Sequence, residues 1–277
     1  MRSIDPGMDA SVVAEIDRRL DAIERDDQVA LPLAIESGSR AWGFPSPDSD
    51  YDCRLLFTRP SARTFSILPE RDVIEREVTP VFDVGGWELR KALQLMLRGN
   101  AVVIEWLTSP ITYRGRADFR EAMLSLARET SQRDLVMRHY ARLAKAMQGR
   151  LREAGRGGLF PLKKLFYVAR PVAAWAWLAD RPGETVAPMH FPTLIEQSEM
   201  DDEVRTEIAE LLEVKARTRE LGTGPVPPGL SGWFEDALET MPQGRVERQE
   251  IDRHALERAD VFHHEWVERL AGGIPDG

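Results

Sequence analysis

Residues 36–54 read ESGSRAWGFPSPDSDYDCR, and this stretch decides how the whole chain is interpreted. The Gly-Ser pair at 38–39 follows one apolar run, and Asp50 and Asp52 open another. Short apolar runs bounded by turn residues are typical of buried β-strands. We therefore expect a strand, a turn-rich loop and a second strand, with the Gly-Ser pair and the aspartates at the two ends of the loop.

The two aspartates lie two residues apart on the second predicted strand, so both side chains leave the same face. Tyr51 and Cys53 point the other way and can pack inward. Two carboxylates about 4 Å apart in a partly buried site repel by about 4 kcal/mol at an effective dielectric constant of about 20. Such a pair needs a cation or a proton, and Mg2+ is the usual cation beside substrate phosphates.

At the other end of the loop, Gly38 lets the backbone approach a ligand closely and adopt a positive φ. Ser39 offers a hydroxyl group, and Ser39 and Arg40 offer backbone N–H donors that suit phosphate oxygens. Carboxylates that hold metal ions, set against donors that hold phosphates, fit a nucleoside triphosphate. We therefore predict that Gly38, Ser39 and Arg40 bind a nucleotide.

The pattern of Gly-Ser, ten intervening residues and Asp-x-Asp resembles the signature of the DNA polymerase beta superfamily of nucleotidyltransferases. The resemblance implies two Mg2+ ions, or Mn2+ in their place, held by Asp50, Asp52 and a third carboxylate that accepts a proton from the attacking hydroxyl. Asp83, which ends an apolar strand before a helix, is the expected third carboxylate, and Glu75 and Glu77 are the alternatives. The alternative without a catalytic role is an aspartate-rich turn in which Asp50 acts as a cap.

A closer resemblance covers residues 37–54, 86–110 and 162–178, which look like the subfamily predicted to act in RNA repair and associated with RNA ligases. It implies transfer of NMP from an NTP (ATP, CTP or GTP) to an acceptor hydroxyl with release of pyrophosphate. The implied acceptor is an RNA or tRNA 3′ end. Two departures do not touch the metal site: Ala101 stands where proline is expected, and Arg98 stands where lysine is usual.

Together with this resemblance, the apolar pattern predicts an α+β fold. We expect a small mixed β-sheet nucleotidyltransferase domain with flanking helices in residues 1–115, followed by an all-helical domain in residues 116–277 that closes the cleft. The predicted strands are 31–37, 50–58, 63–68 and 72–84, and the predicted helices are 9–27, 87–100, 117–154, 161–180, 202–220 and 247–270, with a helix or turn at 101–110. Gly85-Gly86 is expected to break the chain, and Pro171 to kink or break its helix.

A basic segment, residues 138–170, has nine Lys or Arg against one acid, so it carries +8 and the rest of the −9 chain carries −17. Such a segment is either a local anion site or a solvated helix face. As an anion site it favours an RNA or tRNA acceptor. Its basic residues are Arg138, Arg142, Lys145, Arg150, Arg152, Arg156, Lys163, Lys164 and Arg170.

Four residues of the helical half are predicted to bind the nucleotide: Lys163, Lys164, Tyr167 and Arg170. Gaps of four and three place Lys163, Tyr167 and Arg170 on one helix face, with Lys164 one step round. In related two-domain nucleotidyltransferases, the helical domain sends a lysine into the cleft to contact the triphosphate. A surface lysine pair is the alternative.

For three further side chains the sequence indicates possible roles without choosing among them. Trp42 and Phe44, inside the loop, either stack on a base or anchor the loop to the core. Glu105 lies in an apolar segment, where a glutamate needs a partner, and we expect an arginine or a backbone group that braces the site.

Composition limits the remaining choices. A chain of 43% hydrophobic and 30% charged residues is typical of a soluble protein, and one cysteine excludes an internal disulfide framework. We expect a cytoplasmic protein without a membrane-spanning segment. The sequence does not determine its oligomeric state. Two alternatives to an RNA acceptor stay open: AMP transfer to a protein or a small molecule, and a non-catalytic module that binds NTP or RNA.

Overall fold

The computed structural model describes residues 1–155, 158–219, 221–242 and 250–273. Its strands are β1 (Ala30–Ser37), β2 (Tyr51–Thr58), β3 (Val73–Glu75), β4 (Phe82–Glu88), β5 (Thr112–Gly115), β6 (Phe160–Pro161) and β7 (Thr223–Gly224). Its α-helices are α1 (Ala10–Asp27), α2 (Gly38–Ala41), α3 (Ser61–Thr64), α4 (Leu89–Leu97), α5 (Ala101–Thr108), α6 (Ala117–Thr130), α7 (Arg133–Lys145), α8 (Gln148–Gly155), α9 (Leu165–Ala179), α10 (Phe191–Gln197), α11 (Asp202–Arg217), α12 (Pro228–Thr240) and α13 (Arg253–Ala271), with a short 3-10 helix η1 (Leu162–Lys164) before α9.

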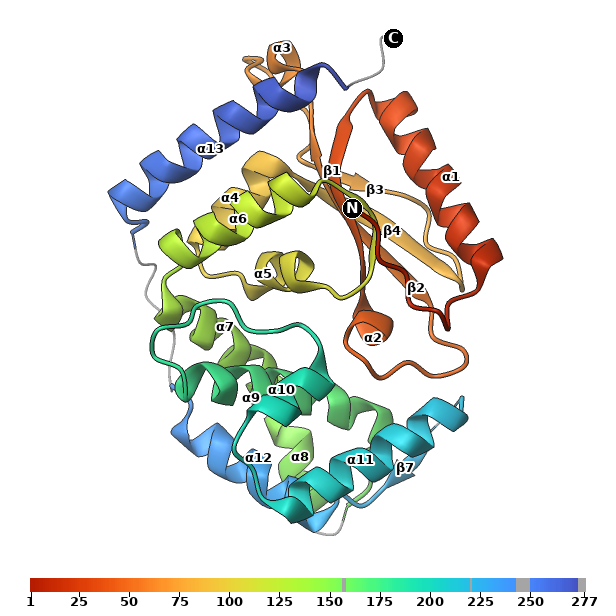
Figure 1. Ribbon diagram of the computed structural model, residues 1–277. Coiled ribbons are helices and arrows are strands. Elements are labelled where there is room, and N and C mark those ends of the chain that lie inside the picture. The colour runs from red at the N-terminus through yellow and green to blue at the C-terminus, as the bar shows by residue number, and fades with distance from the viewer. Residues whose placement is uncertain (156–157, 220, 243–249, 274–277) are drawn as a thin grey trace.

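The N-terminal half is built on one mixed sheet with the strand order β3-β4-β2-β1-β5. Strands β2 and β4 run parallel, and the other neighbouring pairs run antiparallel. Helices surround the sheet, and a helical half lies below it in Figure 1. The predicted α+β fold class, with its small mixed sheet, is confirmed.

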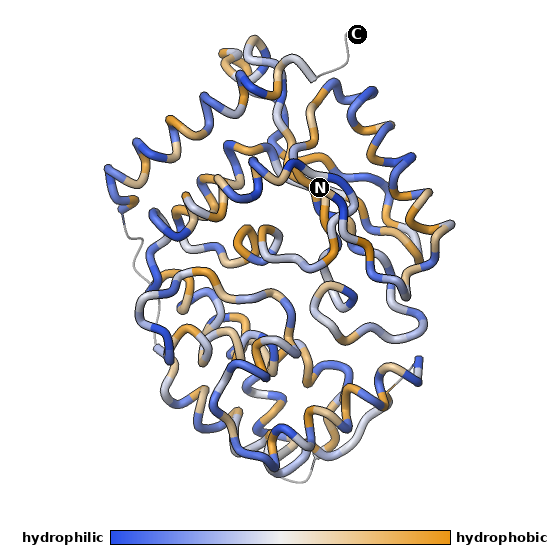
Figure 2. The backbone as a smooth tube through the Cα atoms, in the orientation of Figure 1, coloured by the Kyte–Doolittle hydropathy of each residue, from blue (hydrophilic) through white to orange (hydrophobic). Residues whose placement is uncertain are grey.

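The sheet has a core on each face. Helix α1 covers one face, and its apolar residues Val13, Ile16, Leu20 and Ile23 are buried there. The other face packs against α4 and α5 and continues into the helical half. Figure 2 shows hydrophilic and hydrophobic residues alternating along α1, whereas α5 is mostly hydrophobic, as expected for a helix enclosed between two halves.

The helical half is centred on α9, which packs against α7, α10 and α12. Two helices of the predicted helical domain lie beside the sheet instead: α6 packs against β1, and α13 packs against α4 and α6. The chain therefore returns to its N-terminal half at its end. The predicted domain boundary between 115 and 116 stays a prediction.

Three predictions about strands were wrong. The segment 72–84 is not one strand, because β3 and β4 are antiparallel neighbours with residues 76–81 between them. Residues 63–68 do not form a strand, because the chain makes α3 and a bend there and leaves Ile67 and Leu68 exposed. The pair Gly85-Gly86 does not break the chain but lies inside β4. A side chain at Gly86 would place its Cβ 2.0 Å from the carbonyl oxygen of Leu55, so glycine is used here for close approach between paired strands.

The helical predictions erred mainly in their boundaries. The segment 117–154, predicted as one helix, is three helices. The extended residues Ser131 and Gln132 separate α6 from α7, and another interruption precedes α8. Strand β5 and helices α10 and α12 were not predicted. Among the described residues, none of the helices is both long enough and apolar enough to span a lipid bilayer.

Candidate active site

The loop between β1 and β2 begins with a tight approach of Gly38 to Asp52. Gly38 has φ +63° and opens the short helix α2. A Cβ atom on Gly38 would lie 1.9 Å from Oδ2 of Asp52 and 2.8 Å from its Cγ. Glycine is therefore required at this position for two reasons: the backbone has a positive φ, and the carboxylate of Asp52 leaves no space for a Cβ.

Asp52 and Asp83 lie next to each other on parallel strands. They are register partners at the starts of β2 and β4, and both are half-buried. Asp50 precedes β2 and is exposed. Of the alternatives for the third carboxylate, Glu75 is exposed and pairs with Arg71. Glu77 is exposed as well. The structure thus brings Asp83, and not the glutamates, beside Asp52.

The carboxylates interact electrostatically. The pKa of Asp52 is raised to about 6, chiefly by burial and in addition by the negative charges of Asp50 and Asp83, while Arg54 opposes the shift. A raised carboxyl pKa means that the charged form is disfavoured where it stands. Added positive charge beside Asp52 would therefore be stabilising.

The donor chemistry of these residues suits a hard cation, because Asp50, Asp52 and Asp83 offer only oxygen ligands. Nevertheless, in the chain as far as it is described, no three His, Cys, Asp or Glu side chains are gathered closely enough to hold a metal ion. The guanidinium of Arg54 lies against Asp52 and Asp83. Metal binding by all three carboxylates stays a prediction.

The side chain of Arg40 is used within the loop. Its Nη2 donates to the carbonyl oxygen of Ser49 (2.6 Å), and its guanidinium lies 3.8 Å from the ring centre of Tyr51. The hydroxyl of Ser39 donates to that of Ser49 (2.9 Å). The predicted contact of Arg40 with phosphate therefore depends on its backbone N–H.

Aromatic side chains join the loop to the helical half. Phe44 is buried and stacks on Phe166 of α9, with ring centres 4.9 Å apart. Trp42 meets Tyr167 edge-on at 5.8 Å, and the guanidinium of Arg170 lies 4.3 Å from its ring centre. Of the two roles considered for these aromatics, the contacts support anchoring of the loop.

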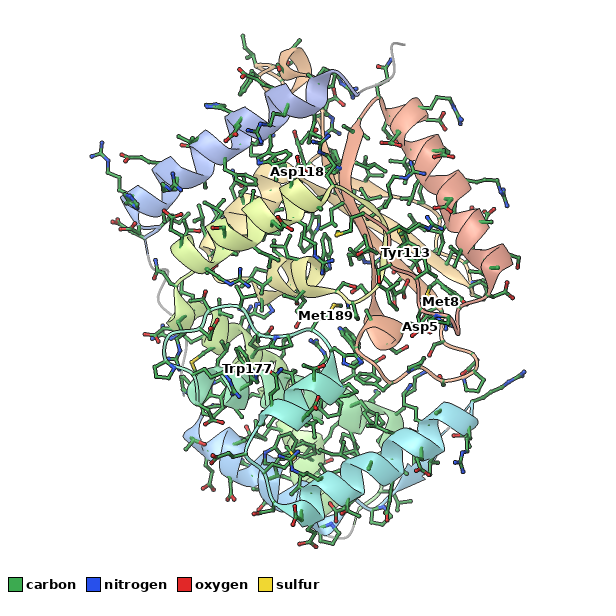
Figure 3. The ribbon with its side chains drawn as sticks, viewed as in Figure 1. Asp5, Met8, Tyr113, Asp118, Trp177 and Met189 are labelled. Carbon is green, nitrogen blue, oxygen red and sulfur yellow. The ribbon has the colours of Figure 1, made fainter. Side chains whose placement is uncertain are left out.

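Two polar contacts from the helical half reinforce this anchor, and no pattern in the sequence indicates them. Lys215 of α11 is 2% exposed and donates from Nζ to the carbonyl oxygen of Phe44 (2.5 Å). Burial, with a smaller effect of Lys163, lowers the pKa of Lys215 to about 8. The backbone N–H of Phe191 donates to the carbonyl oxygen of Trp42 (2.9 Å). Met189, in the segment leading into α10, lies between the two halves (Figure 3).

Arg170 is not placed for the predicted contact with a nucleotide. Its side chain is buried and forms an ion pair with Glu105 of α5. Glu105 is buried as well, so the expected arginine partner of this glutamate is found. Because the guanidinium also packs on Trp42, the placement assigns Arg170 to bracing the loop.

Replacing Arg170 by methionine should lower the free energy of unfolding by about 3 kcal/mol, because it leaves a buried carboxylate without its partner. The double variant Arg170→Met/Glu105→Gln should recover most of this loss. Arg258→Met removes an exposed ion pair with Glu129 and should change the stability far less than Arg170→Met does. Urea denaturation of the variants measures these values. Equal losses in the single and double variants would contradict the bracing role.

The lysines of η1 lie near the loop. Lys163 and Lys164 are both exposed, and Tyr167 is 46% exposed. The pKa of Asp48 in the loop is lowered, chiefly by a hydrogen bond from Ser46 and in part by the charge of Lys163. Lys163 is therefore close enough to the loop to act on it electrostatically, and the predicted nucleotide contacts of Lys163, Lys164 and Tyr167 stay predictions.

The basic residues of segment 138–170 have different roles and do not all lie on one exposed surface. Lys145 donates to the carbonyl oxygens of Met241 (3.1 Å) and Pro242 (2.9 Å), so it joins two parts of the helical half. Arg170 is buried, whereas Arg142, Arg150 and Arg152 are exposed. Arg156 lies outside the described residues.

Glu36 supports the strand that carries Asp52. It is fully buried, its Oε1 accepts the backbone N–H of Asp52 (2.9 Å), and Tyr113 of β5 donates its hydroxyl to Oε2. Figure 3 labels Tyr113 beside the sheet. Burial raises the pKa of Glu36 to about 8, although the hydrogen bond from Tyr113 opposes the shift.

This shift predicts a pH dependence of stability. The folded protein retains the proton of Glu36 between its ordinary pKa of 4.5 and about 8, and the unfolded chain loses it. Glu36 therefore reduces stability as the pH rises through this range, by at most about 1.4 kcal/mol per pH unit. The variant Glu36→Gln should gain stability relative to the wild type with rising pH. Chemical denaturation at several pH values measures the difference, and parallel curves would contradict it.

Comparisons with known proteins identify the family of this chain. Residues 12–265 match the family described as "RNA repair pathway DNA polymerase beta family". A protein of Bacillus subtilis (strain 168), "Uncharacterized protein YcgL", is 38% identical over 207 residues, which are 74% of this chain and 78% of that protein. A solved nucleotidyltransferase-like protein from Exiguobacterium sibiricum 255-15 is 11% identical with a TM-score of 0.28, covering 94% of this chain and 78% of that one, a likeness too low to bear on function. The predicted family is confirmed: the chain belongs to the RNA repair pathway DNA polymerase beta family.

Proposed function

We propose that this protein is a magnesium-dependent nucleotidyltransferase that transfers NMP from an NTP to an acceptor hydroxyl and releases pyrophosphate. The single observation that carries the proposal is the register pairing of Asp52 with Asp83, with Gly38 pressed against the Asp52 carboxylate. Two acids and a glycine from three separate segments meet at one end of the sheet. Membership of the DNA polymerase beta superfamily supports the same chemistry.

Each part of the site has a proposed task. The backbone N–H groups of Ser39 and Arg40 bind the phosphates, because the first N–H groups of a helix have no partner within it. Lys163 and Lys164 add positive charge from the helical half. Asp83 orients the acceptor hydroxyl and accepts its proton. These tasks place the nucleotide between the proposed domains 1–115 and 116–277.

Asp50 and Asp52, with Asp83, would hold the magnesium ions. Bound magnesium supplies positive charge that stabilises the entering and leaving oxygens of an in-line displacement at phosphorus. The protein itself contributes chiefly positioning and fixed charge. The contacts of Trp42, Phe44 and Lys215 with the helical half support this, because they hold the loop that carries the phosphate donors.

The proposed acceptor is an RNA or tRNA 3′ end. Support comes from the family's description as an RNA repair pathway family and from the exposed arginines Arg142, Arg150 and Arg152. Contacts between arginines and phosphates make binding weaken steeply with salt. A protein or small-molecule acceptor would show little such dependence.

Incubation with each α-labelled NTP, Mg2+ and a mixed tRNA pool tests the function. We expect label in RNA, resolved on a denaturing gel and abolished by chelation of the metal. Label in protein would redirect the proposal to a protein acceptor. No label in any fraction, with any of the four NTPs, would contradict the enzyme and favour a non-catalytic binding module.

A further inference from the structure

Arg54 already provides a positive charge at the acidic pair. It lies on β2 two residues after Asp52, so both side chains leave the same face of the strand. Its Nη2 lies 2.6 Å from Oδ2 of Asp83 and 3.4 Å from Oδ1 of Asp52. One guanidinium nitrogen therefore contacts two of the three carboxylates that the proposed function assigns to the metal ions.

The guanidinium is fixed at this position by the backbone. Its Nη1 donates to the carbonyl oxygen of Asp83 (2.9 Å) and to that of Cys53 (3.2 Å). The side chains of the three interacting residues are only 23% (Arg54), 21% (Asp52) and 33% (Asp83) exposed. The planar guanidinium is held by backbone carbonyls at Nη1 and bridges two carboxylates through Nη2. It is therefore pre-organised and loses little conformational freedom in these contacts.

A metal ion and this guanidinium compete for the same two carboxylates. Arg54 occupies Oδ1 of Asp52 and Oδ2 of Asp83, and a divalent cation bound between these acids would lie close to the guanidinium, so the two cations would repel each other. Metal binding to the free protein is therefore opposed as long as Arg54 stays on the carboxylates. The barrier is electrostatic and is present before any substrate arrives.

We propose that Arg54 gates metal binding: it neutralises Asp52 and Asp83 in the free protein and releases them when an NTP provides other anionic oxygens for its guanidinium. Arginine forms bidentate hydrogen bonds with phosphate as well as with carboxylate, so the exchange keeps the guanidinium paired. This inference rests on the proposed function for the identity of the triphosphate. Its prediction for the free protein concerns metal affinity alone.

Binding of Mn2+ to the nucleotide-free protein, followed by the electron paramagnetic resonance signal of free Mn2+, tests the proposal without any catalytic step. The variant Arg54→Met should bind Mn2+ about fivefold more tightly than the wild type, the scale expected for loss of a partly exposed ion pair. Arg54→Lys keeps the charge but not the planar fork, and should bind with intermediate affinity. The double variant Asp52→Asn/Arg54→Met should lose the gain.

Arg76→Met is the matched control. Arg76 is 34% exposed and pairs with a single acid, Asp27, so the variant removes the same charge without touching Asp52 or Asp83. Equal Mn2+ affinity in Arg54→Met and Arg76→Met would overturn the gate, as would tighter binding that persists in the double variant. If Arg54→Met does not fold, Arg54→Lys decides, because its affinity must still exceed that of the wild type. Pyrophosphate release by the wild type tests the proposed function separately, so failure of the gate leaves that result intact.

Discussion

Asp52→Asn is expected to lower nucleotidyl transfer by about a thousandfold, because a metal-holding charge contributes several kcal/mol to the transition state and each 1.4 kcal/mol is about a factor of ten. Asparagine keeps the shape of the side chain and its fit against Gly38 but removes the charge. Asp52 is beside Asp83 on the parallel strand, so no other carboxylate can take its place in the register. The loss should appear in turnover rather than in folding.

The measurement is the rate at which α-labelled NMP is incorporated, with thermal unfolding as the check on the fold. Asp118→Asn is the matched control, because it also replaces one aspartate. Asp118 lies on α6 (Figure 3) and pairs with Arg116. The control variant should leave turnover unchanged. Wild-type turnover in Asp52→Asn would remove Asp52 from the catalytic site.

Gly38→Ala is expected to reduce turnover by about a hundredfold, because a displacement of about 1 Å at the reacting groups can cost that much. The added Cβ would lie 1.9 Å from Oδ2 of Asp52, so the carboxylate has to move. The positive φ adds a cost of about 1–2 kcal/mol in stability for any L-residue. Activity should fall further than the loss of stability explains.

A second glycine separates the two effects. Gly222 also has a positive φ (+67°), but a Cβ there would meet nothing within 4 Å. Gly222→Ala should therefore lose about 1 kcal/mol of stability and keep its turnover. Parallel measurements of unfolding and of turnover test both variants. Equal turnover in the two would show that the approach of Gly38 to Asp52 does not matter for catalysis.

The strands, the loop and the acids of the site could be predicted because their signals are local. Alternation along β2 places Asp52 and Arg54 on one face, so their proximity could also have been predicted from spacing. The choice of Asp83 over Glu75 followed from its position at the end of an apolar run, although it ended up at the start of β4 and not at its end. The pairing of parallel strands then brought it beside Asp52.

The contacts that fix the loop could not be predicted, because they join residues far apart in the chain. Lys215 reaches Phe44 across 171 positions, and Glu105 meets Arg170 across 65. Lys215 lies on an acidic helix and Arg170 lies beside a proline, and neither sequence context indicates that the side chain is buried. Arg170 was predicted to face a nucleotide from helical spacing alone, which identifies a shared face but not what that face contacts.

Pyrophosphate release from each of the four NTPs, with Mg2+ and the tRNA pool present, tests the central claim most directly. The account predicts release by the wild type with at least one NTP, in equal amount to the NMP transferred. Release should stop when the metal is chelated and when Asp52 is replaced by asparagine. Absence of pyrophosphate with every NTP, or undiminished release by Asp52→Asn, would contradict the account.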